Sequence, residues 1–176
     1  MIDPDRNHFE LFGLPATFRV DAAALDRAYR ALQAEVHPDR FADAGDAERR
    51  LAMQRSSRVN EAYRALKDPV ERARYLLSLR GIDAFDERDT QLALPFLEAQ
   101  LERRERAADA AGRGDVAALD AILREVRAES GERQRSLETM LADAERGDAA
   151  KALVRELRFL AIVSEDVEAM LSSLDA

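Results

Sequence analysis

The chain has 176 residues, 47% of them hydrophobic and 35% charged, and a formal net charge of −8. This length allows one domain or two small ones, and the acidic balance argues against binding to nucleic acid or to an anionic membrane, because such binding needs a large basic face. There is no cysteine, no basic and apolar signal peptide and no apolar run of transmembrane length, so we expect no disulfide or thiolate metal site and a cytoplasmic protein.

The first helices of the chain can be placed from their caps. Glycine and proline number only 7 and 5 while strong helix formers dominate, so the sequence predicts an all-α protein. Asn7 and Glu10 have the spacing of a capping box and begin a short helix. Asp21 begins a second helix with an apolar residue every three or four positions, and Pro38 ends it because the residue before a proline avoids the helical conformation.

The next two helices complete a first domain. A polar loop separates the second helix from a third, which runs from an Asp46 cap to about Lys67 and has its own apolar stripe. The pair Asp68–Pro69 supplies a cap and a first-turn proline for a fourth helix, which Gly81 stops. Because two long helices joined by a loop can pack antiparallel, we predict that residues 1–81 form an antiparallel helical hairpin closed by short flanking helices.

The remaining sequence predicts a second helical domain. Residues 82–93 are polar and lack helical periodicity, which is typical of a linker or an ordered loop between domains. Pro95 begins a new helix, Asp115 caps another after a glycine turn, and Gly147 precedes the last. Residues 94–176 are therefore predicted to form a three-helix bundle, which carries the chain's excess of acidic residues.

The loop between the two long helices contains His37-Pro38-Asp39. Pro38 fixes the direction in which the chain leaves the helix, so its neighbours are presented from a stiff loop. An imidazolium at His37 would be favoured by the helix dipole, and the Asp39 carboxylate has two acceptor oxygens that match an arginine of a partner. In isolation, however, such residues more often serve only to end a helix and begin a turn.

The surroundings of the tripeptide point to a family. The segments Tyr29–Leu32 and Asn60–Pro69 lie on the two long helices, and with the tripeptide they closely resemble the J-domain family over roughly residues 8–80. The resemblance implies that the loop contacts a DnaK-type chaperone and stimulates its ATP hydrolysis. The chaperone-binding residues that it implies are His37, Pro38 and Asp39, with basic contacts from Arg27, Arg30 and Arg40.

A longer resemblance covers nearly the whole chain. It rests on the segments Phe9–Pro15, Arg72–Gly81, Phe96–Glu102 and Leu157–Leu160, which with the acidic bundle are similar to the HscB family of iron-sulfur cluster assembly. The resemblance implies that the C-terminal domain binds an IscU-like scaffold protein and delivers it to an HscA-like chaperone. The scaffold-binding residues that it implies are Leu97, Leu101, Glu102, Glu105 and Phe159. No cofactor or metal site is expected in the chain itself.

Helix geometry gives partial support to this second site. At about 100° per residue, Phe159 points roughly 200° away from the core-facing leucine two positions before it. Ile162 and Val163 lie near Phe159, so a second apolar patch is expected there. The pair Leu97 and Leu101 is less decisive, because leucines four residues apart on a helix are more often core than interface.

The sequence leaves alternatives to this function. A J-domain protein could use its acidic bundle to recruit a different client. An enzyme that uses His37 with Asp39 as a general base is disfavoured, because the chain has only two histidines, no metal-ligand cluster and no glycine-rich phosphate loop. A purely structural helical protein would be insensitive to substitution of the tripeptide. We expect a co-chaperone that stimulates a partner's ATPase and is not an enzyme itself.

Overall fold

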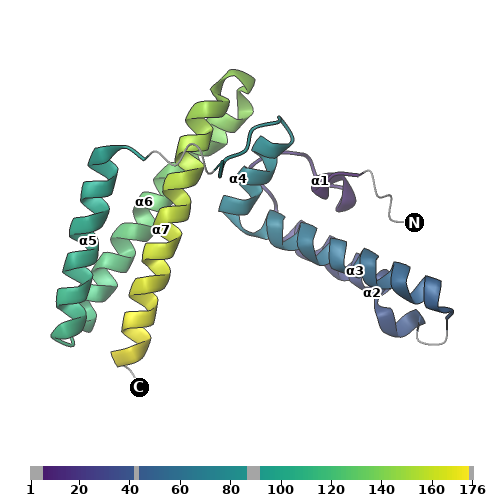
Figure 1. Ribbon diagram of the computed structural model, residues 1–176, viewed down its shortest axis with the longest axis horizontal. Coiled ribbons are helices and arrows are strands. Elements are labelled where there is room, and N and C mark those ends of the chain that lie inside the picture. The colour runs from purple at the N-terminus through teal and green to yellow at the C-terminus, as the bar shows by residue number, and fades with distance from the viewer. Residues whose placement is uncertain (1–5, 42–43, 87–91, 175–176) are drawn as a thin grey trace. The chain divides into compact units, whose positions relative to one another are not determined.

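The computed structural model describes residues 6–41, 44–86 and 92–174, with only the backbone at position 38. In this part of the chain all regular structure is helical, which confirms the predicted class (Figure 1). The chain divides into two compact units, Met1–Leu76 and Leu77–Ala176. No helix in the described ranges is long and apolar enough to cross a membrane. The elements are α1 (His8–Leu11), α2 (Ala22–Val36), the 3-10 helix η1 (Pro38–Phe41), α3 (Asp46–Lys67), α4 (Pro69–Ser78), α5 (Leu94–Gly112), α6 (Val116–Ala142), the 3-10 helix η2 (Ala144–Arg146) and α7 (Gly147–Leu174).

The first unit is built around a hairpin of α2 and α3, which lie side by side (Figure 1). The predicted capping box is present: the Glu10 N–H donates to Asn7 Oδ1 at 3.0 Å, and the Asn7 N–H donates to the Glu10 carboxylate at 2.9 Å. The Asp21 carboxylate accepts from two N–H groups in the first turn of α2, also as predicted. The largest fully buried side chains of this unit are Phe9, Leu25, Val59 and Leu66.

The start of α3 differs from the prediction. Its N-cap is Gly45, which has no side chain to accept from the helix N–H groups, and Asp46 is the first helical residue instead of the cap. Asp46 forms an ion pair with Arg49 one turn later. Because negative charge is favourable in the first turn of a helix, Asp46 stabilises α3 by its charge and not by capping. Positions 42 and 43 of the predicted loop lie outside the described residues.

The junction between α3 and α4 follows the prediction. Helix α3 ends at Lys67, Asp68 accepts from the Glu71 N–H at 2.8 Å, and Pro69 opens α4. Beyond α4, Gly81 has a φ of +76°, a left-handed conformation that glycine adopts readily. This conformation turns the chain out of the helix.

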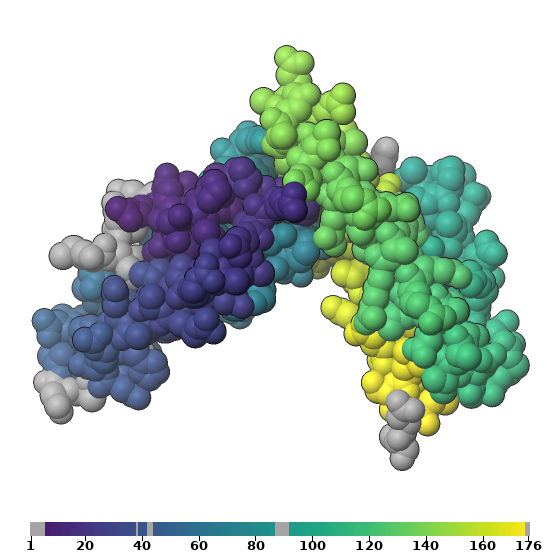
Figure 2. All heavy atoms as spheres, turned by 180° about the vertical axis from the view of Figure 1, so that it is seen from behind, coloured from purple at the N-terminus to yellow at the C-terminus, as the bar shows by residue number. Residues whose placement is uncertain are grey.

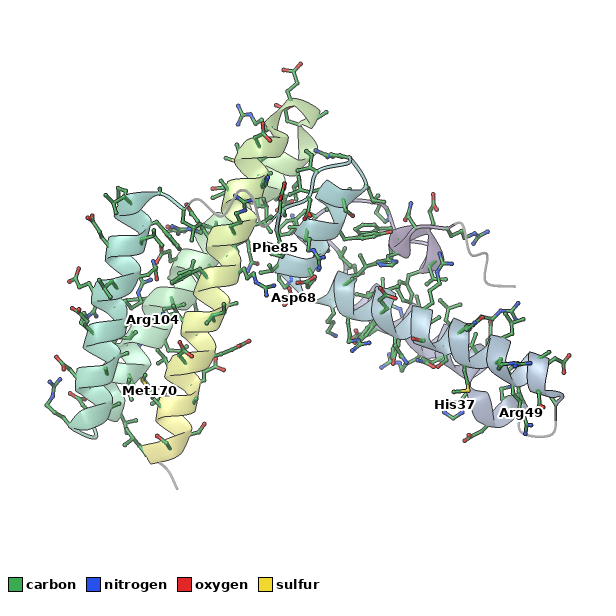
Figure 3. All side chains as sticks on the ribbon, viewed as in Figure 1. His37, Arg49, Asp68, Phe85, Arg104 and Met170 are labelled. Atoms are coloured by element: carbon green, nitrogen blue, oxygen red, sulfur yellow. The ribbon has the colours of Figure 1, made fainter. Side chains whose placement is uncertain are left out.

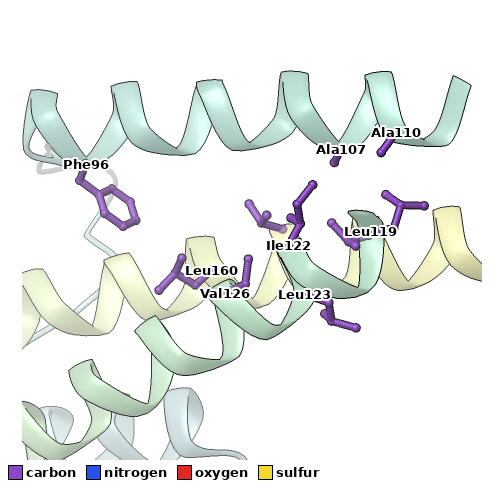
Figure 4. Packing of buried hydrophobic residues seen from close by; sticks show 10 residues of the cluster. Phe96, Ala107, Ala110, Leu119, Ile122, Leu123, Val126 and Leu160 are labelled. Carbon is purple, nitrogen blue, oxygen red and sulfur yellow. The ribbon is translucent and has the colours of Figure 1, made fainter. Parts of the chain in front are cut away.

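The second unit is a bundle of α5, α6 and α7, as predicted. From the side shown in Figure 2, α6 (green) lies in front of α5 (teal) and α7 (yellow). Buried side chains from the three helices meet in one core, which includes Phe96 from α5, Ile122 and Val126 from α6 and Leu160 from α7 (Figure 4). Pro95 is the second residue of α5 and not the first, because the helix begins one position earlier.

The segment that follows α4 packs on α6 and α7. Arg80 donates to the Asp143 carbonyl at 3.2 Å and also to the Leu141 carbonyl, both at the end of α6. Arg155 on α7 donates to the Ala84 carbonyl at 2.8 Å. The bonds of Arg80 hold the end of the predicted first domain to α6, and the bond to Ala84 orders the first half of the predicted linker. Residues 87–91 of that linker lie outside the described residues.

Candidate functional site

The tripeptide His37-Pro38-Asp39 begins where α2 ends. His37 is the C-cap of α2, with φ −58° and ψ 128°, and η1 follows it directly. His37 and Arg49 lie at the same end of the hairpin (Figure 3). The Asp39 backbone N–H donates to His37 Nδ1 at 3.3 Å. This short-range contact orients the imidazole ring relative to the backbone of the loop.

The Asp39 carboxylate is the most open part of this loop. Its side chain is 89% exposed, and its oxygen Oδ2 lies 3.5 Å from His37 Nδ1. The exposed carboxylate is available to an arginine of a partner. The side chain of Pro38 lies outside the described residues.

The three predicted basic contacts differ in their surroundings. Arg27 and Arg30 are exposed on α2. Arg30 lies two helical turns before His37, on the same face of the helix. Arg40 instead turns back: its Nη1 donates to the Ala34 carbonyl at 2.9 Å. This bond satisfies one of the carbonyls left unpaired in the last turn of α2. Arg40 therefore shapes the loop, whereas Arg27 and Arg30 are exposed to a partner.

A polar seam between α2 and α3 supports the loop. The Tyr29 hydroxyl donates to Asn60 Oδ1 at 2.9 Å, and Gln33 Nε2 donates to the same oxygen. The sequence analysis used Tyr29 and Asn60 only as family matches, although the four-residue spacing of Tyr29 and Gln33 indicates that both face one neighbour. A shallow, open hollow beside the seam is lined by Tyr29, Arg30, Gln33, His37, Ser56 and Asn60.

A second group of contacts continues the seam toward the start of α2. Tyr63 stacks on Tyr29 with ring centroids 4.0 Å apart, and its hydroxyl donates to Asp26 Oδ1 at 2.8 Å. Lys67 Nζ lies 2.6 Å from the same oxygen. Hydrogen bonds from Lys67 and Tyr63 lower the pKa of Asp26, and in return Asp26 raises the pKa of Lys67. These contacts fix the register of α2 against α3. They therefore also fix the position of His37 at the end of α2.

A second candidate surface lies on the bundle helices α5 and α7. Leu97 and Leu101 are 38% and 61% exposed, so the core role that their spacing favours is wrong for this pair. The reason is that Phe96, one position earlier, takes the core-facing place on α5. Leu94 and Ile162 are also exposed and extend the surface. Leu94 was not predicted, although its spacing from Leu97 and Leu101 is that of one helix face.

Phe159 borders this surface from α7. Its ring is partly buried and meets Phe96 edge-on, with centroids 5.7 Å apart and planes at 79°. The expected position of Val163 beside Phe159 in a second patch is wrong, because Val163 is buried with Leu160 in the core. The patch on α7 therefore consists of Phe159 and Ile162, which are one turn apart.

Glu102 and Glu105 lie on α5 close to the exposed leucines in sequence. Both side chains are exposed, and neither forms an ion pair with another described residue. An apolar strip with carboxylates beside it suits a partner that combines apolar and basic groups. Within the described ranges, no three or more potential ligands are grouped so that they could hold a metal ion.

Two family models match the chain. A model described as the DnaJ domain matches residues 7–75, and a model described as the HSCB C-terminal oligomerisation domain matches residues 94–168. The chain is 50% identical to a co-chaperone protein HscB homolog of Burkholderia multivorans and 49% identical to one of Burkholderia cenocepacia. Each alignment spans 175 residues and covers 99% of this chain and 99% of the relative.

Solved structures give the same likeness. The chaperone HscB from Vibrio cholerae is 39% identical with a TM-score of 0.86, over 96% of this chain and 99% of that chain. The human co-chaperone protein HscB is 30% identical with a TM-score of 0.87, over 96% of this chain and 83% of that chain. The similarity therefore extends through both compact units.

Proposed function

Because the chain belongs to the HscB family of J-domain co-chaperones, we propose that it stimulates the ATPase of a DnaK-type, HscA-like chaperone and delivers an IscU-like scaffold protein to it. In this proposal the protein supports the maturation of iron-sulfur proteins and performs no catalysis of its own. The observation that carries the proposal is that each compact unit presents a set of exposed residues to a partner. The first unit presents Asp39, Arg27 and Arg30, and the second presents Leu97 and Leu101 with the carboxylates beside them. Because the chain has no cysteine with which to bind a cluster, we assign the cluster to the scaffold as its cargo.

The contact with the chaperone is assigned to the tripeptide and α2. The exposed Asp39 carboxylate provides a charged acceptor, and a hydrogen bond to such a group contributes about 1.5–3 kcal/mol. Arg27 and Arg30 add positive charge that steers and orients an acidic partner surface. Arg40 takes part mainly by holding the loop against α2.

The contact with the scaffold is assigned to the bundle surface. Leu97, Leu101 and Phe159 provide the apolar centre, and Glu102 and Glu105 provide carboxylates for basic groups of the scaffold. Full burial of a leucine side chain is worth roughly 1.5–3 kcal/mol, and side chains that already lose part of their exposure in the free protein gain less.

The domain limits and the location of the protein follow from the same proposal. We assign residues 1–81 to the J-domain, 82–93 to a linker and 94–176 to the scaffold-binding bundle; the start of α5 at Leu94 supports the last of these limits. We propose that the complex acts in the cytoplasm, where ATP is available to the partner.

Steady-state ATP hydrolysis by an HscA-like chaperone tests the proposal directly. The wild-type protein should raise the rate, and should raise it further when an IscU-like scaffold is present. An unchanged rate with both partners present would rule the proposal out. If the rate rises but a pull-down recovers another client and no scaffold, the bundle serves a different client of a J-domain co-chaperone, which is the second candidate.

A further inference from the structure

Arg104 connects the two helices that carry the bundle surface. Its side chain extends from α5 toward α7 (Figure 3), where its guanidinium donates to Asp166 Oδ2 at 3.2 Å. The same guanidinium lies 5.3 Å from the centroid of the Phe159 ring. Arg104 is therefore in contact with both a charged and an aromatic residue of α7.

The Phe159 ring is held by two neighbours. Phe96 on α5 meets it edge-on, and Arg104, also on α5, lies over the ring. A cation over an aromatic face is attracted by the negative charge of that face. Asp166 contacts the same guanidinium, so the ion pair favours the position of the cation over the ring. The two contacts together restrict the orientation of a side chain that is only partly buried.

The position of Arg104 on α5 links it to the exposed leucines. Leu97, Leu101 and Arg104 have the spacing four and three of a single helix stripe. Phe159, Ile162 and Asp166 have the spacing three and four of a facing stripe on α7. Each apolar stripe thus ends in one member of the Arg104–Asp166 ion pair, which closes the surface at one end.

We propose that Arg104 is a positioning residue of the scaffold-docking surface. It holds the Phe159 ring in its contact with Phe96 and fixes α5 against α7, so that Leu97, Leu101 and Phe159 form one surface before the partner arrives. This inference rests on the proposed function, since it takes the scaffold as the partner. Its energetic basis is preorganisation: a side chain ordered in advance does not have to be ordered on binding.

A matched ion pair on the same helix distinguishes this role from simple stabilisation. Arg106 on α5 pairs with Glu125 on α6 through two hydrogen bonds of 3.0 and 3.1 Å. The side-chain exposures of that pair, 47% and 46%, are close to the 47% and 50% of Arg104 and Asp166. Arg106 lies over no aromatic ring in the described part of the chain. Loss of either pair should therefore affect stability similarly, and only loss of Arg104 should affect docking.

The experiment measures the dissociation constant for an IscU-like scaffold by titration calorimetry with the full-length protein. Arg104→Gln should weaken binding about five- to tenfold. Arg104→Lys keeps the cation and should restore binding to within about threefold of wild type. Arg106→Gln should leave binding within about twofold of wild type. The thermal midpoints of Arg104→Gln and Arg106→Gln should be alike, and stimulation of the chaperone without scaffold should be unchanged in both.

A double variant tests whether Arg104 acts through Phe159. If it does, Arg104→Gln combined with Phe159→Ala should bind no more weakly than Phe159→Ala alone. If the fold-losses in scaffold affinity of the two single variants multiply in the double variant, the positioning role is overturned and Arg104 is a direct contact. Equal affinities of Arg104→Gln, Arg106→Gln and wild type would overturn the inference while leaving the proposed function intact. A wild-type protein that does not bind the scaffold would instead overturn the proposed function.

Discussion

His8 stacks on Tyr75, with ring centroids 4.0 Å apart and an interplanar angle of 12°. The backbone N–H of His8 also donates to the Tyr75 hydroxyl at 3.0 Å. The pair joins α1 to α4, and Phe9 of α1 contacts the same tyrosine ring at a centroid distance of 6.1 Å. The short first helix is thus fixed to the fourth by three contacts, one of which, the stacking of the His8 ring on Tyr75, involves an imidazole that can take up a proton.

We predict that stability falls in mild acid because of this histidine. Burial lowers the pKa of His8 below its ordinary 6.5; Glu61 acts to raise it and Arg58 to lower it further. The unfolded chain therefore takes up the proton at a higher pH than the folded chain. The contribution of His8 is fully present above pH 6.5 and is lost as the pH falls from 6.5 through the folded pKa. Urea unfolding at several pH values below and above 6.5 measures this loss.

Two variants separate this effect from other titrations. His8→Phe keeps a ring on Tyr75 and removes the proton site, so its stability should vary less with pH than that of the wild type. His37→Gln removes the other histidine, which is exposed, and should keep the wild-type dependence. A pH dependence that is the same in His8→Phe as in the wild type would refute the assignment to His8.

Asp39→Asn should abolish stimulation of the chaperone without affecting the fold. The side chain is 89% exposed, so removal of its charge should change the unfolding free energy by less than about 0.5 kcal/mol. The partner, however, loses a charged acceptor, and the chaperone ATPase assay should show a rate near the unstimulated one. Asp46→Asn is the control, because it removes another exposed carboxylate, 80% open, from the same unit. Stimulation by Asp39→Asn at the wild-type level would contradict the role of the tripeptide.

Leu97→Ala/Leu101→Ala/Phe159→Ala should have the opposite effect to Asp39→Asn: it should lose scaffold binding and keep chaperone stimulation. Scaffold binding measured by calorimetry should be lost, because the apolar centre of the surface is removed, while stimulation of the chaperone without scaffold should persist. Leu79→Ala/Val116→Ala removes two exposed apolar side chains elsewhere and should bind the scaffold normally. Retained binding by the triple variant would place the scaffold on another surface.

The helix ends were predictable because their signals are local. The capping box of Asn7 and Glu10 and the cap of Asp21 involve side chains and N–H groups within one turn, so a short stretch of sequence specifies them. The same logic failed at Asp46, where the chain has two adjacent residues able to precede a helix. The helix begins one position earlier than expected, with Gly45 as its cap.

The composition of the docking surface was less predictable because it depends on packing between helices. Phe96 and Leu97 are adjacent apolar residues, and the sequence does not say which of them faces α6; the structure buries Phe96. Val163 was misplaced for the same reason. Arg104 gave no signal as a site residue, because its role depends on the approach of α7, more than fifty residues away in sequence.

A final prediction concerns a charged network inside the bundle. Arg103 lies 2.6 Å from Glu129, Glu129 lies 2.8 Å from Arg133, and Arg133 lies 2.7 Å from Glu156. The four side chains are only 12–22% exposed, and they join α5, α6 and α7. Charges in such positions are weakly screened and depend on their partners.

Glu129→Gln should therefore destabilise the protein by about 2 kcal/mol, because it removes the carboxylate partner of Arg103 and one of the two of Arg133. Glu125→Gln is the matched control: it breaks the exposed pair with Arg106 on the same helix and should cost less than about 1 kcal/mol. Urea unfolding at low and high salt measures both. Added salt should reduce the cost of Glu125→Gln and leave that of Glu129→Gln nearly constant, since only the exposed pair is screened by ions. Equal costs and equal salt dependence would show that the network contributes no more than a surface ion pair.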